Sequence, residues 1–171
     1  TTGSPPDRLH SVALTLADST DAHLFERSSG RILRAYHHDG RVNQFAWDPR
    51  GRFLAVACHD FRTYLWDAEA GVLRWSQEGH EAEVVRTDFH PRGDFFLTGG
   101  WDNKVHAWDA WTGHDLFVLP RQEVRFGRDG NSLGTVSNLG YDLIEIAPAP
   151  PAFTLHGHEK PNDKQPYMVA L

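Results

Sequence analysis

Short apolar runs, each ended by a turn signal, follow one another along the chain. Around its best-defined stretch, the runs lie at Val84–Phe89, Phe95–Gly99, Val105–Trp108 and Asp115–Leu119. The turn-forming sequences His-Pro-Arg-Gly, Trp-Asp-Asn and Trp-Thr-Gly separate them. Runs such as FLAVAC and FFLTGG are apolar at successive positions, which is typical of strands covered on both faces. The pattern predicts an all-β fold in which units of four short antiparallel strands form stacked sheets.

This pattern repeats with a period near 42 residues, the kind of internal repeat that decides the whole fold. The pair Trp66-Asp67 recurs 42 residues later as Trp108-Asp109, and His38 recurs as His80. The same offset relates Asp48-Pro49 to His90-Pro91, Gly51 to Gly93, and Asp60 to Asp102. Earlier and later copies follow at offsets of 41 and 37 residues, at Leu24-Phe25-Glu26 and at Phe126–Gly130.

The chain is a single repeat segment, residues 1–171, which the repeat divides into successive units. Residues 1–38 are expected to supply the last three strands of a partial first unit, with VALTL as its second strand and HLFE as its third. Residues 39–79 and 80–119 form two full units, and residues 120–156 a degenerate fourth. In that fourth unit, APAPPA at 147–152 is expected to replace the usual turn before the last strand. Residues 157–171 either begin a fifth unit or supply a strand that closes the first sheet.

Composition and charge exclude several classes of protein. The net charge is −6 and the 17 Lys and Arg residues are scattered, whereas a nucleic-acid partner calls for a basic stripe. One cysteine, Cys58, excludes an internal disulfide framework and is expected to be buried in a strand. No apolar run approaches the roughly 20 residues of a membrane span, and no signal peptide is visible. We therefore expect no nucleic-acid or membrane partner and a cytoplasmic location.

A period near 40 residues that opens on Gly-His and closes on Trp-Asp resembles the WD40 repeat. The resemblance covers nearly the whole chain and implies four-stranded blades arranged radially in a β-propeller. About four blades are then present, either as part of a larger propeller or as a closed four-bladed ring. The degenerate, arginine-rich units resemble WD40 arrays of bacteria.

The resemblance also implies a structural hydrogen-bonded set in the third unit, made of His80, Thr98, Asp102 and Trp108. A buried indole N–H needs an acceptor, and a hydroxyl and an imidazole can connect it to a carboxylate. The second unit keeps a partial set, His38, Asp60 and Trp66. Because Val56 replaces its hydroxyl, we expect the connection in that unit to be broken. The fourth unit is expected to have none of the set.

Two chemical readings compete with this structural one. Thr98, His80 and Asp102 are the residue types of a hydrolase triad, but no G-x-S-x-G elbow precedes a helix, and we expect no catalytic residue. The eleven histidines suggest a metal site as the second alternative. The closest groups are His37-His38 and His156-Gly157-His158, yet the repeat accounts for most of them, and no Cys₂His₂ or HExxH spacing occurs. We therefore expect no metal and no cofactor.

Trp101 is the residue of the third unit that the repeat does not require. The resemblance places it on the top face of the propeller, among the loops between second and third strands, where His59 is its equivalent one unit earlier. Starts of the first strands face the same rim, at Arg41, Asn43, Glu83 and Val85. A large exposed aromatic side chain on a rigid scaffold is a candidate anchor for a partner. The alternatives are that Trp101 packs on a neighbouring loop and that the rim charges are simply solvated.

These features predict a non-enzymatic scaffold that binds protein or peptide partners, or the remaining blades of the same protein, on its top face. One alternative is the docking region of a larger signalling enzyme, such as a bacterial Ser/Thr kinase. Its catalytic part would lie elsewhere, since no Gly-rich loop, H-R-D or D-F-G sequence occurs here. Another alternative is a propeller enzyme with its site in the central channel.

Overall fold

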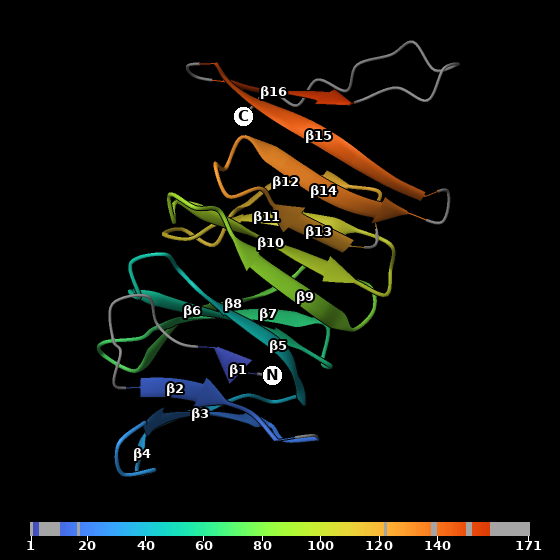
Figure 1. Ribbon diagram of the computed structural model, residues 1–171. Helices are drawn as coiled ribbons and strands as arrows, with labels where there is room; N and C mark the ends of the chain where they lie inside the picture. The colour runs from blue at the N-terminus through green and yellow to red at the C-terminus, as the bar shows by residue number, and fades with distance from the viewer. Residues whose placement is uncertain are drawn as a thin grey trace.

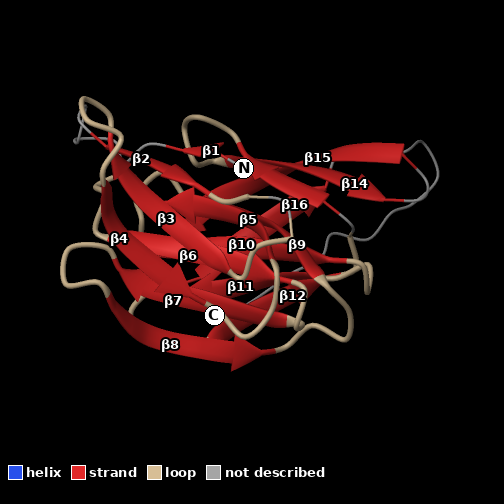
Figure 2. Ribbon diagram, turned by 90° about the horizontal axis from the view of Figure 1, so that it is seen from below, coloured by secondary structure: helices blue, strands red, loops and turns tan. Residues whose placement is uncertain are grey.

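The computed structural model describes residues 2–3, 11–16, 18–121, 123–137, 140–149 and 152–157. Every regular element within these residues is a β-strand, and Figure 2 shows strands joined by loops without any helix. It follows that no helix of this described part could cross a membrane. The strands form four antiparallel, four-stranded sheets, so the all-β prediction is confirmed.

Each sheet takes its strands in chain order. The first contains β1 (Thr2–Gly3), β2 (Ser11–Leu14), β3 (Asp21–Glu26) and β4 (Ile32–His37). The second contains β5 (Val42–Trp47), β6 (Phe53–Cys58), β7 (Arg62–Asp67) and β8 (Val72–Glu78). The third contains β9 (Val84–Phe89), β10 (Phe95–Gly100), β11 (Val105–Asp109) and β12 (Asp115–Leu119). The fourth contains β13 (Glu123–Phe126), β14 (Ser132–Ser137), β15 (Gly140–Ala149) and β16 (Ala152–Gly157).

Three expectations about the ends of the chain need correction. The first sheet is not limited to three strands, because β1 pairs with β2 through Thr2↔Leu14 and Gly3↔Ala13. The segment 147–152 is not wholly a turn, because β15 continues to Ala149, which pairs with Ala152 of β16. Gly157 is the last residue of β16 and so belongs to the fourth sheet. His158 and the expected strand at 167–171 lie outside the described residues.

The four sheets stack in chain order, with the first and the fourth at opposite ends of the stack (Figure 1). A separate apolar core fills each interface. Tyr36 and Val56 are buried between the first two sheets, Phe96 and Leu65 between the second and third, and Leu133 with its neighbours between the third and fourth. The described sheets do not close on themselves, so they form part of a propeller.

The Asp of each Trp-Asp pair shapes the turn that follows. Asp109 Oδ1 accepts hydrogen bonds from the backbone N–H groups of Trp111 and Thr112, at 2.9 and 2.7 Å. Gly113 then takes a positive φ of 73°, which a residue without a Cβ adopts at no steric cost. Asp67 accepts two backbone N–H groups of its own turn in the same way. The repeated sequence therefore encodes the repeated turn directly.

Side chains on the first strands join neighbouring sheets. Asn43 Nδ2 of β5 donates to the carbonyl of Val84 in β9, at 2.8 Å. The backbone N–H of Thr87 donates to Gln44 Oε1 at 2.9 Å. These contacts tie the second sheet to the third at the strand starts that carry the predicted rim.

Candidate functional site, a cleft beside Trp101

A cleft of about 380 Å³ opens where the second, third and fourth sheets meet. Its lining includes four of the predicted rim residues together with Trp101. The full lining is Arg41, Asn43, Glu83, Val85, Arg86, Gly100, Trp101 and Val136. Trp101 is 67% exposed, so its indole stands free at the edge of the cleft rather than packing into a core. Of the two placements considered for Trp101, the structure has the exposed one.

The loops around the cleft are held by a hydrogen bond that recurs with the repeat. The backbone N–H of Trp101 donates to the carbonyl of Glu83, at 3.0 Å. One sheet earlier, the N–H of His59 donates to the carbonyl of Arg41, at 2.9 Å. Each bond joins the loop between second and third strands to the start of the first strand. The rim backbone is therefore fixed before any partner arrives.

Charged groups of both signs alternate along this rim. Arg41 lies 2.8 Å from a carboxylate oxygen of Asp18 and 3.5 Å from one of Glu83. Glu83 also lies 2.9 Å from His59 Nε2. These side chains are partly exposed, so each pair contributes little to stability. Their effect is to orient the Arg41 guanidinium at the cleft mouth.

Sequence reasoning found most of the cleft but not all of it. His59 contacts Glu83 without lining the cleft. Arg86, Gly100 and Val136 line it and were not anticipated. Gly100 and Arg86 are next to predicted residues in the sequence, so extending the rim by one position would have included them. Val136 comes from the fourth sheet, where the weaker repeat gave no signal.

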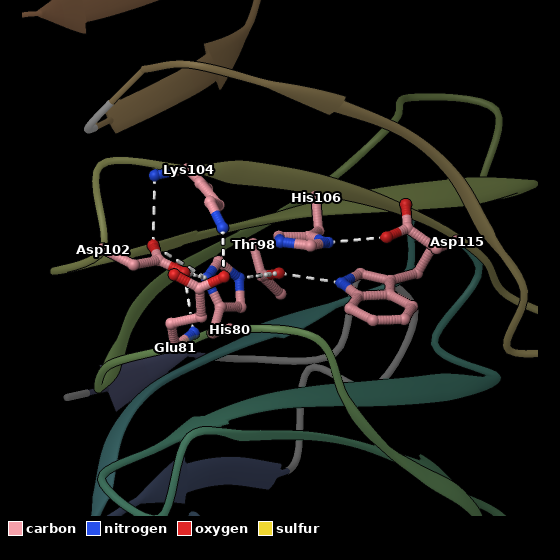
Figure 3. Close-up of polar contacts among 8 residues, drawn as sticks. His80, Glu81, Thr98, Asp102, Lys104, His106 and Asp115 are labelled. Atoms are coloured by element: carbon pink, nitrogen blue, oxygen red, sulfur yellow. Dashed lines mark hydrogen bonds and ion pairs between the residues drawn. The ribbon is translucent and has the colours of Figure 1, made fainter.

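Beneath this rim, the four predicted residues of the third sheet form one continuous hydrogen-bonded chain. Trp108 Nε1 donates to Thr98 Oγ1 at 2.8 Å, and Thr98 Oγ1 lies 2.9 Å from His80 Nε2. His80 Nδ1 lies 3.0 Å from Asp102 Oδ2 (Figure 3). Since Thr98 accepts from the indole, its hydroxyl proton points to Nε2, and Nδ1 of the imidazole carries the proton given to Asp102. The indole, the hydroxyl, both imidazole nitrogens and the carboxylate of this set therefore all have hydrogen-bond partners.

The local environment favours these protonation states. Burial, and then the neighbouring His106, lowers the pKa of His80, which keeps the imidazole neutral. Burial alone would raise the pKa of Asp102, but the N–H of Glu81 and the pairing with His80 outweigh it, so that pKa lies below its ordinary value. Asp102 also accepts the N–H of Lys104 at 3.0 Å. The carboxylate fixes both loop backbones next to Trp101.

In the second sheet the connection from the indole to the aspartate is broken, as expected, and the indole has a different partner. Trp66 Nε1 donates directly to His38 Nε2 at 2.9 Å, without an intervening hydroxyl. His38 Nδ1 lies 3.0 Å from the carbonyl of Thr20. Asp60 accepts the hydroxyl of Tyr64 at 2.6 Å instead. The Trp66 indole therefore has a hydrogen-bond partner although Val56 provides no hydroxyl.

The fourth sheet retains one member of the set, contrary to the expectation of none. Thr135 lies 37 residues after Thr98 and is likewise buried in a second strand, at 1% exposure. Its hydroxyl has no hydrogen-bond partner within the described part of the chain. The fourth sheet therefore has the threonine of the set without the matching tryptophan and histidine.

The arrangement of Thr98, His80 and Asp102 is not suited to nucleophilic catalysis. Thr98 is fully buried, and its hydroxyl already accepts from the Trp108 indole. A substrate carbonyl would need space next to that oxygen. Cys58 is also fully buried, and burial raises the pKa of its thiol, which favours the unreactive protonated form.

Comparisons with known proteins match the same repeat. The family described as WD domain, G-beta repeat matches residues 71–109, and the anaphase-promoting complex subunit 4 WD40 domain matches residues 12–75. WD repeat-containing protein 72 of Pongo abelii is 37% identical over 76 residues, 44% of this chain and 6% of that protein. Its counterparts from Mus musculus and Homo sapiens are 36% and 34% identical over the same length and shares.

The match spans only 6% of each relative, so it does not assign the activities of those whole proteins to this chain. The comparisons do support the repeat itself, since the matched residues 12–109 contain Gly79-His80, both Trp-Asp pairs of the repeat and all four strands of the second sheet. Such repeats generally build interaction scaffolds rather than catalytic sites. Residues 12–109, matched by these two models together, consist of WD40 repeats.

Proposed function

We propose that this chain is a protein-interaction module that holds a peptide segment of a partner in the cleft beside Trp101. The observation that carries the proposal is the exposed indole of Trp101 at the edge of a cleft whose backbone is already fixed. Tryptophan buries a large area on binding at a small entropic cost, and it is enriched among residues that dominate binding energy. A fixed rim reduces the cost of ordering the site.

The lining indicates the chemistry of the segment. Val85 and Val136 supply apolar surface on the same cleft as the Trp101 indole. Arg41 supplies a guanidinium at the mouth, held by Asp18 and Glu83. At about 380 Å³, the cleft lies toward the lower end of the roughly 300–1,000 Å³ of ligand sites. It accommodates one or two side chains, so we expect an apolar anchor residue whose flanking polar groups meet the charged rim.

A selection from a random peptide display library tests the proposal, with the purified 171-residue chain as target. The affinity of a selected, fluorescently labelled peptide is then measured by anisotropy. Trp101→Ala should weaken binding at least about tenfold, a typical loss for an aromatic anchor, and Arg41→Ala should weaken it less.

Trp111→Ala provides the matched control. Trp111 is 50% exposed and follows the other end of β11, away from the cleft. Peptides that bind the Trp101→Ala chain as tightly as the wild type, or that lose affinity only with Trp111→Ala, would show that the cleft is not the site.

A further inference from the structure

His106 has a buried ring nitrogen without a hydrogen-bond partner among the described residues. The residue lies in β11, is 5% exposed, and its Nε2 is the unpartnered atom. Its other nitrogen, Nδ1, lies 2.6 Å from Asp115 Oδ2. Because the carboxylate accepts the Nδ1 proton, Nε2 presents a lone pair. Figure 3 shows this second nitrogen pointing away from Asp115, toward the side where His80 lies.

Two further side chains that can ligate a metal ion, His80 and Asp102, lie near that lone pair. The rings of His80 and His106 lie 4.4 Å apart, centroid to centroid. One ligand atom from each of His80, Asp102 and His106 can be chosen so that all lie within 4.8 Å of one another. Ligands of a tetrahedral ion, at about 2.0–2.1 Å from it, are about 3.3 Å apart. Side-chain movements of about 1 Å therefore bring the three atoms to coordination distance.

The second sheet shows what fills the corresponding place when a hydroxyl is present. Tyr64 precedes His106 by 42 residues and occupies the same position on its third strand. Its hydroxyl donates to Asp60 at 2.6 Å. In the third sheet, His106 Nε2 carries no proton that it could donate to Asp102. Lone pairs of the Asp102 carboxylate and of His106 Nε2 therefore face the same space.

We propose that His80, Asp102 and His106 bind a divalent transition-metal ion of the Zn²⁺ class. Two imidazoles and one carboxylate are a common ligand set for such an ion, with a fourth position left for water. The ion takes the place of the proton that His80 Nδ1 shares with Asp102. That proton moves to Nε2 of the same imidazole, which donates it to Thr98 Oγ1 while the Thr98 hydroxyl turns its own proton away. His80 thus stays neutral and its ligation releases no net proton.

The surrounding groups favour this exchange. Asp115 holds the Nδ1–H of His106, which is the outer carboxylate usually found behind a metal-bound histidine. Glu81 pairs with Lys104 at 2.6 Å, so the one lysine adjoining Asp102 is already neutralised. Gly79 and Glu81 are exposed on either side of His80, which places the cluster just below the surface.

Calorimetric titration of the untagged 171-residue chain with Zn²⁺ tests the proposal, in two buffers of different ionisation enthalpy. We expect one ion per chain and nearly the same binding heat in both buffers, because ligation releases no net proton. Asp115→Asn should weaken binding by about 10–100-fold, the usual effect of losing an outer carboxylate. His106→Tyr, which copies Tyr64 of the second sheet, should abolish binding while leaving the metal-free melting temperature close to that of the wild type.

His114→Asn is the control, because His114 is exposed and lies beside Asp115 in the sequence. It should leave both affinity and stoichiometry unchanged. Co²⁺ should give the visible absorption of a tetrahedral site in the wild type and not in His106→Tyr. Absence of binding at millimolar Zn²⁺, or binding that survives His106→Tyr and falls with His114→Asn, overturns the proposal. The first result would mean that water alone fills the space, and the second that surface histidines bind the ion.

Discussion

Replacing Thr98 by valine tests whether the hydrogen-bonded chain of the third sheet stabilises the fold. The substitution keeps the shape of a fully buried side chain and exchanges its hydroxyl for a methyl group. That hydroxyl accepts from Trp108 Nε1 at 2.8 Å and lies 2.9 Å from His80 Nε2. Both partners are buried, Trp108 at 2% and His80 at 6% exposure. Water therefore cannot replace the missing group.

The magnitude follows from these two lost partners. A buried donor or acceptor left unsatisfied costs about 1–3 kcal/mol, and the added methyl returns about 0.8 kcal/mol of apolar burial. We expect Thr98→Val to lower the free energy of unfolding by about 2–4 kcal/mol. For a chain of this size, the melting temperature should fall by about 5–15 °C. Urea unfolding followed by circular dichroism measures the first quantity, and a thermal scan the second.

Thr135→Val is the internal control, because Thr135 is equally buried but its hydroxyl has no partner within the described residues. Removing that hydroxyl should leave stability unchanged or raise it by up to about 1 kcal/mol. The reasoning is refuted if Thr98→Val costs less than about 0.5 kcal/mol. That result would mean that Trp108 turns directly to His80, as Trp66 does to His38 in the second sheet.

Stability should also depend on pH and on one turn glycine. Burial lowers the pKa of three histidines below 6.5, His38, His80 and His90. The unfolded chain therefore binds protons below about pH 6.5 that the folded chain binds only at lower pH, so stability is full above that value and decreases as pH falls. A urea midpoint at pH 5.5 as high as at pH 7.5 would contradict this. Gly113→Ala should destabilise more than Gly30→Ala, because both have positive φ but only the Cβ at 113 meets an aromatic ring, 2.9 Å away. Similar unfolding free energies for the two variants would show that the ring accommodates the methyl group.

Most of the fold could be predicted because its determinants are short-range. The third sheet has its strands within one residue of the predicted bounds, since turn residues such as Gly93 and Asp109 fix where each strand stops. The repeat supplied the positions of Trp108, Thr98 and the other members of the set. It also indicated that Trp101 lies on a rim. The degenerate fourth unit was harder to predict, because β15 extends through a proline-rich stretch whose composition favours a turn.

The partners of buried polar groups could not be predicted in the same way. Trp66 bonds directly to His38, and His38 to the carbonyl of Thr20 rather than to Asp60, which depends on how two rings from different parts of the chain approach each other. The cleft depends on three sheets meeting at one place, and Val136 contributes through packing rather than through any motif.

The sequence by itself determined the strand pattern, the turns and which residue types recur at each position. Those features follow from backbone geometry and from interactions within one unit. Only the tertiary structure decided that β1 completes the first sheet, that Trp101 stands exposed, and that His106 presents a lone pair toward His80 and Asp102. The reason is that hydrogen-bond partners are selected by distances of a few tenths of an ångström between strands, and spacing along the chain does not specify such distances.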